Sequence, residues 1–203
     1  MQRQESLIPK YGGYRNLKSF QIGQLIYDVT VRFVEQYIDK FSRTRDQMEQ
    51  AARSGVQNIA EGSAASATSK KTELKLTNVA KSSQEELKLD YEDFLRQRDL
   101  PQLEPDDPIL KRFKARRCKT LAEVQAWIAD ERKRTDKHGP ARTDTDGYHR
   151  LSSAALAANA ALSLINLCTY LLDKQIQAQA KAFENQGGFT ERMYRIRQQN
   201  RKR

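Results

Sequence analysis

The chain has 203 residues, of which 38% are hydrophobic and 31% charged, a balance typical of a globular protein with one core. Few glycines and prolines interrupt long stretches of helix-forming residues, and no alternating run of β-branched and aromatic residues predicts a strand. The formal net charge of +10 attracts polyanions such as nucleic acid, and a solvated basic surface that keeps the protein in solution is the other interpretation.

Three segments in the first half carry apolar residues at helical spacing: 16–42, 44–61 and 69–98. We predict one long helix in each. Thr44 is expected to cap the second helix and Gly62 to end it, and Ser69 or Thr68 caps the third. The preceding residues, 1–15, are expected to form a flexible arm.

Three prolines end this pattern and predict a boundary: Pro101, Pro105 and Pro108. Two shorter helices are expected after it, at about 107–117 and 120–135. Thr120 and Glu123 form a capping box for the second of them. A polar loop follows over residues 136–148.

The fourth long helix, at about 150–185, is apolar on more than one side. It must therefore be covered on several sides, either within its own bundle or also by a neighbouring subunit. Its segment 154–172 reaches membrane length, but it is Ala-rich and carries several polar residues. We interpret it as a buried helix, find no signal-peptide pattern in residues 1–15, and expect a cytoplasmic protein.

These segments predict an all-α fold, an antiparallel up-down four-helix bundle with an inserted helical segment between helices 3 and 4. The expected parts are a flexible arm, bundle helices 1–3, the inserted helical segment with its loop, bundle helix 4 and a basic tail: 1–15, 16–99, 100–149, 150–186 and 187–203.

Residues 47–62 (QMEQAARSGVQNIAEG) resemble the second-helix signature of the bacterial four-helix bundle proteins, also called the 23S rRNA intervening-sequence proteins. The resemblance includes 25–30 (LIYDVT) and the third-helix residues Ala80, Ser83, Glu86 and Leu87, and it covers about residues 14–97. The segment around 100–150 and the basic tail are similar to the longer, suffix-bearing members.

This resemblance implies a bundle that assembles into a ring, commonly a pentamer. Relatives include the accessory variability determinant of diversity-generating retroelements, a basic ring that binds nucleic acid and a reverse transcriptase. The family usually has two arginines where this chain has Glu49 and Gln50. No role of those arginines is therefore carried over.

Residues 111–119 (KRFKARRCK) hold six cations in nine positions with no acid. Lysine and arginine bind phosphates through charge, and arginine also through its bidentate fork. We therefore predict a salt-dependent nucleic-acid interface of low sequence specificity, and a solvated face is the alternative. The predicted residues are Lys111, Arg112, Lys114, Arg116, Arg117, Lys119, Arg132, Lys133, Arg134, Arg192, Arg195 and Arg197, and further tail cations are Arg201, Lys202 and Arg203.

Other polar and aromatic residues have two interpretations each. Phe113 is expected to pack rather than stack on a base, and both roles stay open for Tyr194. Asn58 and Glu61 are interpreted as fixing helix register or capping rather than as a recognition site. Cys118 lies among cations, which can make a thiol reactive, but we interpret it as incidental.

No catalytic pattern is found in the sequence, because His138 and His149 have no Cys or Glu at metal-ligand spacing and no Gly-rich phosphate loop is present. We expect no enzyme activity, no cofactor and no metal. The predicted function is a non-catalytic, homo-oligomeric basic scaffold that binds RNA or DNA. The alternative is an adaptor whose inserted helices around Trp127 dock a protein partner such as a reverse transcriptase.

Overall fold

The computed structural model describes residues 13–137 and 151–201, and in this part of the chain the regular secondary structure is entirely helical. The predicted all-α class is confirmed. In chain order the elements are η1 (Tyr14–Asn16), α1 (Lys18–Tyr37), α2 (Arg43–Ala65), α3 (Lys70–Arg96), α4 (Pro108–Arg116), α5 (Leu121–Lys137), α6 (Ser153–Gln186) and α7 (Phe189–Arg201). The expected loop with His138 and His149, most of the expected arm, and Lys202 and Arg203 lie outside the described residues.

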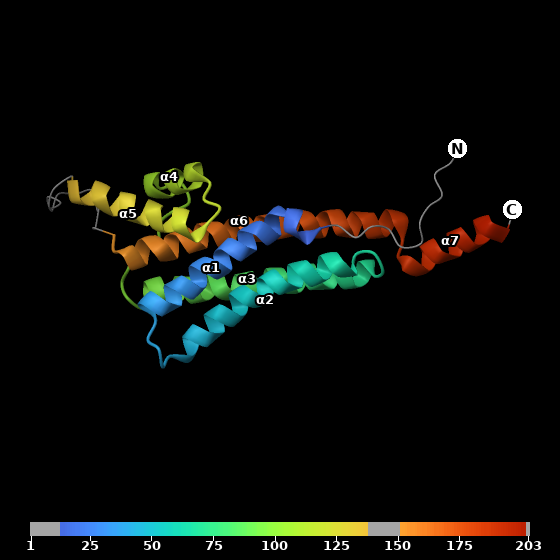
Figure 1. Cartoon of the computed structure of the whole chain (residues 1–203), viewed down its shortest axis with the longest axis horizontal. Coiled ribbons are helices and arrows are strands. Elements are labelled where there is room, and N and C mark those ends of the chain that lie inside the picture. The colour runs from blue at the N-terminus through green and yellow to red at the C-terminus, as the bar shows by residue number, and fades with distance from the viewer. Residues whose placement is uncertain (1–12, 138–150, 202–203) are drawn as a thin grey trace.

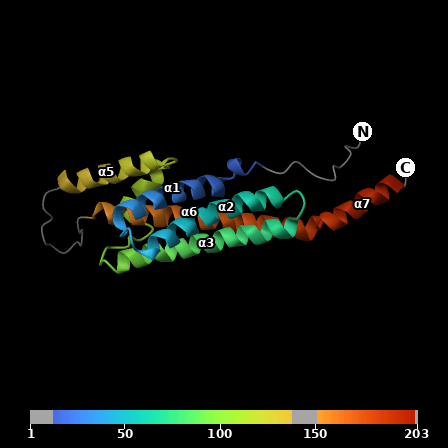
Figure 2. The same ribbon diagram turned by 60° about the horizontal axis from the view of Figure 1, so that its bottom comes forward.

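The helices α1, α2, α3 and α6 run along the long axis of the molecule (Figures 1 and 2). Here α2 packs on α1 and α3, and α6 packs on α1 and α3. The inserted helices α4 and α5 lie on the side of α6 and α1 that faces away from α3 (Figures 1 and 2). The last helix, α7, extends past the end of the other helices (Figure 1).

Serine side chains cap the beginnings of α2, α3 and α6. Ser42 accepts a hydrogen bond from the Thr44 N–H at 3.3 Å, so Ser42 caps α2 and the expected cap at Thr44 was wrong. Ser69 caps α3 as expected, and Ser152 caps α6 by accepting from a backbone N–H at 3.1 Å. Each cap satisfies a backbone donor that has no partner inside its helix.

Gly62 does not end α2, which continues to Ala65. A Cβ at this position would lie 3.3 Å from the Glu73 carbonyl oxygen and 3.3 Å from the Leu76 Cβ on α3. Gly62 therefore allows the close approach of α2 to α3, and its role as a helix stop was a wrong prediction.

Asn159 fixes the connection between α3 and α4 to the core. This side chain is 1% exposed; its Oδ1 accepts from the Leu103 N–H at 2.8 Å, and its Nδ2 donates to the Pro101 carbonyl at 3.0 Å. At the end of that connection Pro108 is the first residue of α4, where its missing N–H costs no helical hydrogen bond, and Asp107 caps the helix.

Helix α6 is covered within one chain over most of its length. The side chains of Leu156, Ile165, Cys168 and Leu172 are at most 1% exposed, and α1, α3, α4 and α5 all pack on this helix. By length and composition α6 is the one described helix that reaches the membrane range, and 72% of its most apolar stretch is buried in the protein. Burial of this extent is typical of a core helix.

Candidate nucleic-acid interface

The inserted segment folds back on itself, and side chains of α4 contact α5. Phe113 and Trp127 are both buried, and their ring centroids lie 4.7 Å apart. The prediction that Phe113 packs is confirmed. Helix α4 ends at Arg116, and the left-handed φ of 49° at the next residue, Arg117, turns the chain towards α5.

Arg112 forms a bidentate ion pair with Glu131 across the two inserted helices. Its Nε lies 2.7 Å from Oε1 and its Nη2 lies 2.5 Å from Oε2 of a carboxylate that is 5% exposed. Arg134 approaches the same carboxylate at 3.8 Å. A buried carboxylate needs such partners, so Arg112 acts first as a link between α4 and α5.

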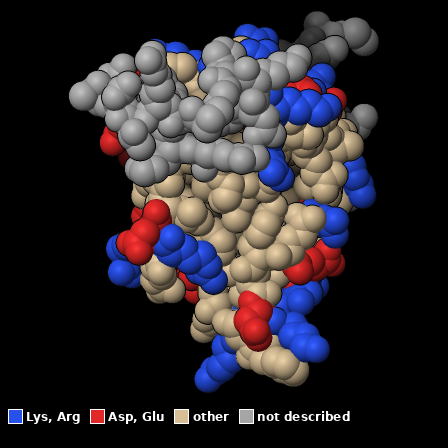
Figure 3. All heavy atoms as spheres, turned by 90° about the vertical axis from the view of Figure 1, so that its left-hand side faces the viewer, with Lys and Arg blue, Asp and Glu red and all other residues tan. Residues whose placement is uncertain are grey.

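Three other predicted cations have partners within the chain. Arg116 lies 2.7 Å from Asp130, and this hydrogen bond lowers the pKa of the Asp130 carboxyl below its ordinary value. Lys114 donates to the Pro105 carbonyl at 2.6 Å, and Arg132 donates to the Ser153 hydroxyl at 3.0 Å. Figure 3, which shows the end of the molecule at the left of Figure 1, accordingly has basic and acidic groups side by side.

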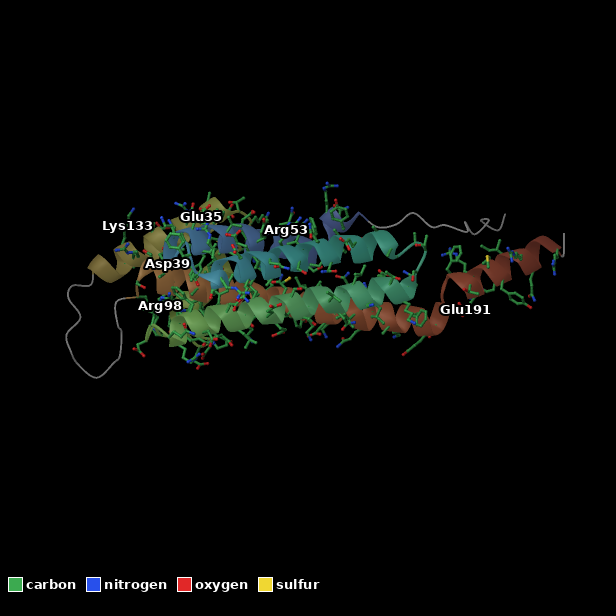
Figure 4. The ribbon with its side chains drawn as sticks, turned by 90° about the horizontal axis from the view of Figure 1, so that it is seen from below. Glu35, Asp39, Arg53, Arg98, Lys133 and Glu191 are labelled. Atoms are coloured by element: carbon green, nitrogen blue, oxygen red, sulfur yellow. The ribbon has the colours of Figure 1, made fainter. Side chains whose placement is uncertain are left out.

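The remaining cations of the inserted segment are exposed, and their side chains form no hydrogen bond or ion pair with a described residue: Lys111, Arg117, Lys119 and Lys133. Lys133 points away from α5 (Figure 4). The structure therefore divides the predicted interface into cations that hold the fold and cations that face solvent.

The predicted cations of the chain end lie on α7, at the opposite end of the molecule from α5 (Figure 4). Arg195, Arg197 and Arg201 are exposed and Arg192 is half-buried. The single acid of α7, Glu191, accepts a hydrogen bond from the Gly188 N–H at 2.9 Å. Sequence reasoning did not predict this helix.

Tyr194 lies among the α7 arginines and is 63% exposed. Its hydroxyl accepts a hydrogen bond from Gln198 at 2.8 Å, one turn further along the helix. The ring is thus presented on the helix surface, where a base can stack on it.

A hollow of about 350 Å³ lies where α7 leaves the body. Its walls are the turn between α2 and α3, with Ser66, Thr68, Ser69 and Lys70, and the junction with Arg192 and Arg195. Hydroxyls and cations around a small hollow suit a phosphate group. The turn residues were missed from the sequence, because nothing local places residues 66–70 beside residue 192.

A larger open groove of about 1220 Å³ lies between α1, α6 and the inserted segment. Four cations line it: Lys18, Lys114, Arg117 and Lys119. Its apolar lining includes Ile22, Leu164, Leu167 and Tyr170. Asp28 also lines the groove, and partial burial raises the pKa of its carboxyl.

Two further interpretations are decided by the contacts. Asn58 donates to the Ser54 carbonyl of its own helix at 2.9 Å, and the bond between α2 and α3 is made by the Ser54 and Ser83 hydroxyls at 3.1 Å. The expected register bond from Asn58 to a neighbouring helix was therefore wrong. Cys118 is 6% exposed and burial raises the pKa of its thiol, contrary to the reactive interpretation.

Comparison of the chain with protein-family models, curated proteins and solved structures gives no match. The resemblance to the bacterial four-helix bundle proteins therefore stays a prediction. Among the described residues no group of three or more side chains could hold a metal ion.

Proposed function

We propose that this protein is a non-catalytic, cytoplasmic scaffold that binds RNA or DNA with little sequence specificity, mainly through α7. The observation that carries the proposal is the position of this helix. It extends beyond the other helices (Figure 2), and its exposed Arg197 and Arg201 form no hydrogen bond or ion pair with a described residue. These two side chains can therefore reach the phosphates of a nucleic acid.

The side chains of α7 support contact with a nucleic acid on more than one side. Successive residues of a helix are about 100° apart, so Arg197 and Arg201 share one side while Arg192 and Arg195 share another. Tyr194 adds an exposed ring for stacking. The exposed Lys111 and Lys133 provide a second, weaker contact at the other end of the molecule.

We also propose that the four long helices constitute an antiparallel four-helix bundle and that copies of the chain associate, as the resemblance implies. Association would present several α7 helices to one nucleic-acid strand. The effective concentration of each further contact would then rise, which strengthens binding without new contacts within a subunit.

The test is a titration of fluorescent single-stranded RNA and DNA by anisotropy between about 50 and 200 mM salt. Replacement of Arg197 and Arg201 by glutamine removes two phosphate contacts. The slope of log K against log[salt] should become shallower by about 1.4 per chain for a single strand, with a clear loss of affinity at low salt.

The matched control replaces Arg43 and Arg53 of α2 by glutamine, because both are exposed and the change in net charge is the same. We expect a much smaller loss for this control. Absence of binding by the wild-type protein at low salt would contradict the proposal, and so would equal losses in the two variants.

The alternative function is a protein-interaction adaptor, and the groove beside the inserted segment is the observation that favours it. An adaptor of this kind binds no nucleic acid at low salt. The same titration therefore separates the two functions.

A further inference from the structure

The groove between α1, α6 and the inserted segment leaves apolar surface uncovered. Leu167 is 44% exposed and Tyr170 is 57% exposed, although both belong to the central helix of the molecule. Exposed apolar side chains inside a concave surface indicate an interaction site more strongly than scattered ones do. The groove follows α1 from Lys18 to Asp28, about 15 Å at the rise of an α-helix.

The charged residues that line this groove are mostly positive. Four cations stand around it, from α1 (Lys18), from α4 (Lys114) and from the turn after α4 (Arg117 and Lys119), against the single carboxylate of Asp28. The side chains of Arg117 and Lys119 form no ion pair with a described residue. A complementary surface must therefore be apolar at its centre and acidic at its edges.

Helix α3 carries a surface with these properties on the outside of the molecule. Leu89 is 62% exposed. At about 100° per residue, one pair of carboxylates lies on each side of Leu89: Glu86 with Asp93, and Glu85 with Glu92. This acidic face spans 85–93, about 12 Å of helix, so its length fits the groove.

Asp90, beside the acidic face, is a carboxyl group whose ionised form is disfavoured in the isolated chain. Burial, and then the charges of Glu86 and Asp93, raise the pKa of the neighbouring Asp90 to about 6. Cations of α3 lie near three of the four carboxylates of the face: Lys88 is 3.9 Å from Glu92, Arg96 is 2.7 Å from Asp93, and Lys81 interacts with Glu85. Cations from outside the chain would stabilise the ionised carboxylates.

We propose that the groove of one copy binds the acidic face of α3 of a second copy, with Leu89 packed on Leu167 and Tyr170. This inference rests on the self-association in the proposed function and identifies its interface. Figures 1 and 2 place α3 and the inserted segment on opposite sides of the body. Each copy therefore offers both halves of a head-to-tail contact, which produces a closed ring or an open chain of copies.

Charge reversal tests this contact. One variant reverses the groove (K18E/K119E) and another reverses the acidic face (E85K/E86K). The third combines all four changes and restores complementarity with the two signs exchanged. The matched control, R43E/R53E, reverses two exposed charges on α2, away from both surfaces.

Mass in solution is measured for each protein by light scattering without nucleic acid, and circular dichroism verifies helix content. The wild-type protein and the control should have the mass of two or more chains of 23.4 kDa each. Each double variant should have the mass of one chain, and the fourfold variant should regain the wild-type mass.

A wild-type protein with the mass of one chain overturns this inference together with self-association, whereas nucleic-acid binding is judged separately by the anisotropy titration. If the wild-type protein associates and both double variants keep its mass, copies associate through another surface and only the interface proposed here is wrong. The proposed interface is also contradicted if the double variants are single chains and the fourfold variant does not associate. In that case charge complementarity between the groove and the acidic face would not be the cause of association.

Discussion

The ion pair between Arg112 and Glu131 gives the sharpest test of which cations hold the fold. Replacement of Arg112 by leucine leaves a carboxylate that is 5% exposed without its two short hydrogen bonds. Removal of one partner from a fully buried pair costs about 3–5 kcal/mol, and in this pair the carboxylate is buried while the Arg112 side chain is 39% exposed. We expect the lower end, about 3 kcal/mol, because the Arg134 guanidinium remains 3.8 Å from the Glu131 carboxylate.

The double variant R112L/E131L removes both charges and places apolar side chains at the contact. Its free energy of unfolding should lie within about 1 kcal/mol of the wild-type value, since apolar replacement of a buried pair is often neutral. The control K111L changes an adjacent, exposed lysine and should cost less than about 0.5 kcal/mol.

Urea unfolding followed by circular dichroism measures these differences. With a slope of about 2–3 kcal/mol/M, R112L should lower the midpoint by about 1 M or more. Its affinity for RNA, measured under native conditions, should be close to that of the wild-type protein. A variant R112L with wild-type stability and a large loss of RNA affinity would refute this reasoning and place Arg112 in the nucleic-acid interface.

Two further predictions concern α3. Because the pKa of Asp90 is raised in the folded state, ionisation of this carboxyl lowers the stability of the wild-type protein as the pH rises from about 4 to 6. In urea melts, D90N should be more stable than the wild-type protein by about 1 kcal/mol at pH 7.5, a value reduced for solvent screening. Below about pH 4 the two proteins should be equally stable. An Ala Cβ at Gly55 of α2 would overlap the Nε2 of the buried Gln84 on α3, so G55A should destabilise the wild-type protein by about 1–3 kcal/mol. In a Q84A background the same change should stabilise the protein by about 1 kcal/mol, because alanine has the higher helix propensity. An effect of the same sign in both backgrounds would contradict the clash.

Helix positions in this chain follow from local information, and their ends depend partly on neighbours. The 3.6-residue pattern and the cap at Ser69 are properties of a few consecutive residues, so α3 begins where it was predicted. Gly62 has the identity of a helix stop but lies inside α2, because the approach of α3 requires a residue without a side chain. Only tertiary packing separates these two roles of a glycine.

The helix α7 was missed although a signal was present. Phe189, Met193 and Ile196 have helical spacing, but their number is small and arginines dominate the segment. By its charge alone, a short basic stretch of this kind is predicted to be a solvated tail without regular structure.

The candidate site shows what charge counting omits. Residues 111–119 contain no acid, so all six cations appeared available for phosphates. The partners of Arg112 and Arg116 are Glu131 and Asp130, which lie 19 and 14 residues further along the chain on α5. The pairing depends on how α4 meets α5, and no local spacing rule contains that geometry.

The amount of apolar surface on α6 indicates that several neighbours cover it, but it does not say whether those neighbours belong to the same chain. Here α4 and α5 cover a side that a second subunit would otherwise cover, so the composition of α6 is no argument for association. The apolar surface that the inserted segment leaves uncovered is what favours association. Leu167 and Tyr170 remain exposed beside Arg117 and Lys119, and the acidic face around Leu89 matches the groove in length and charge.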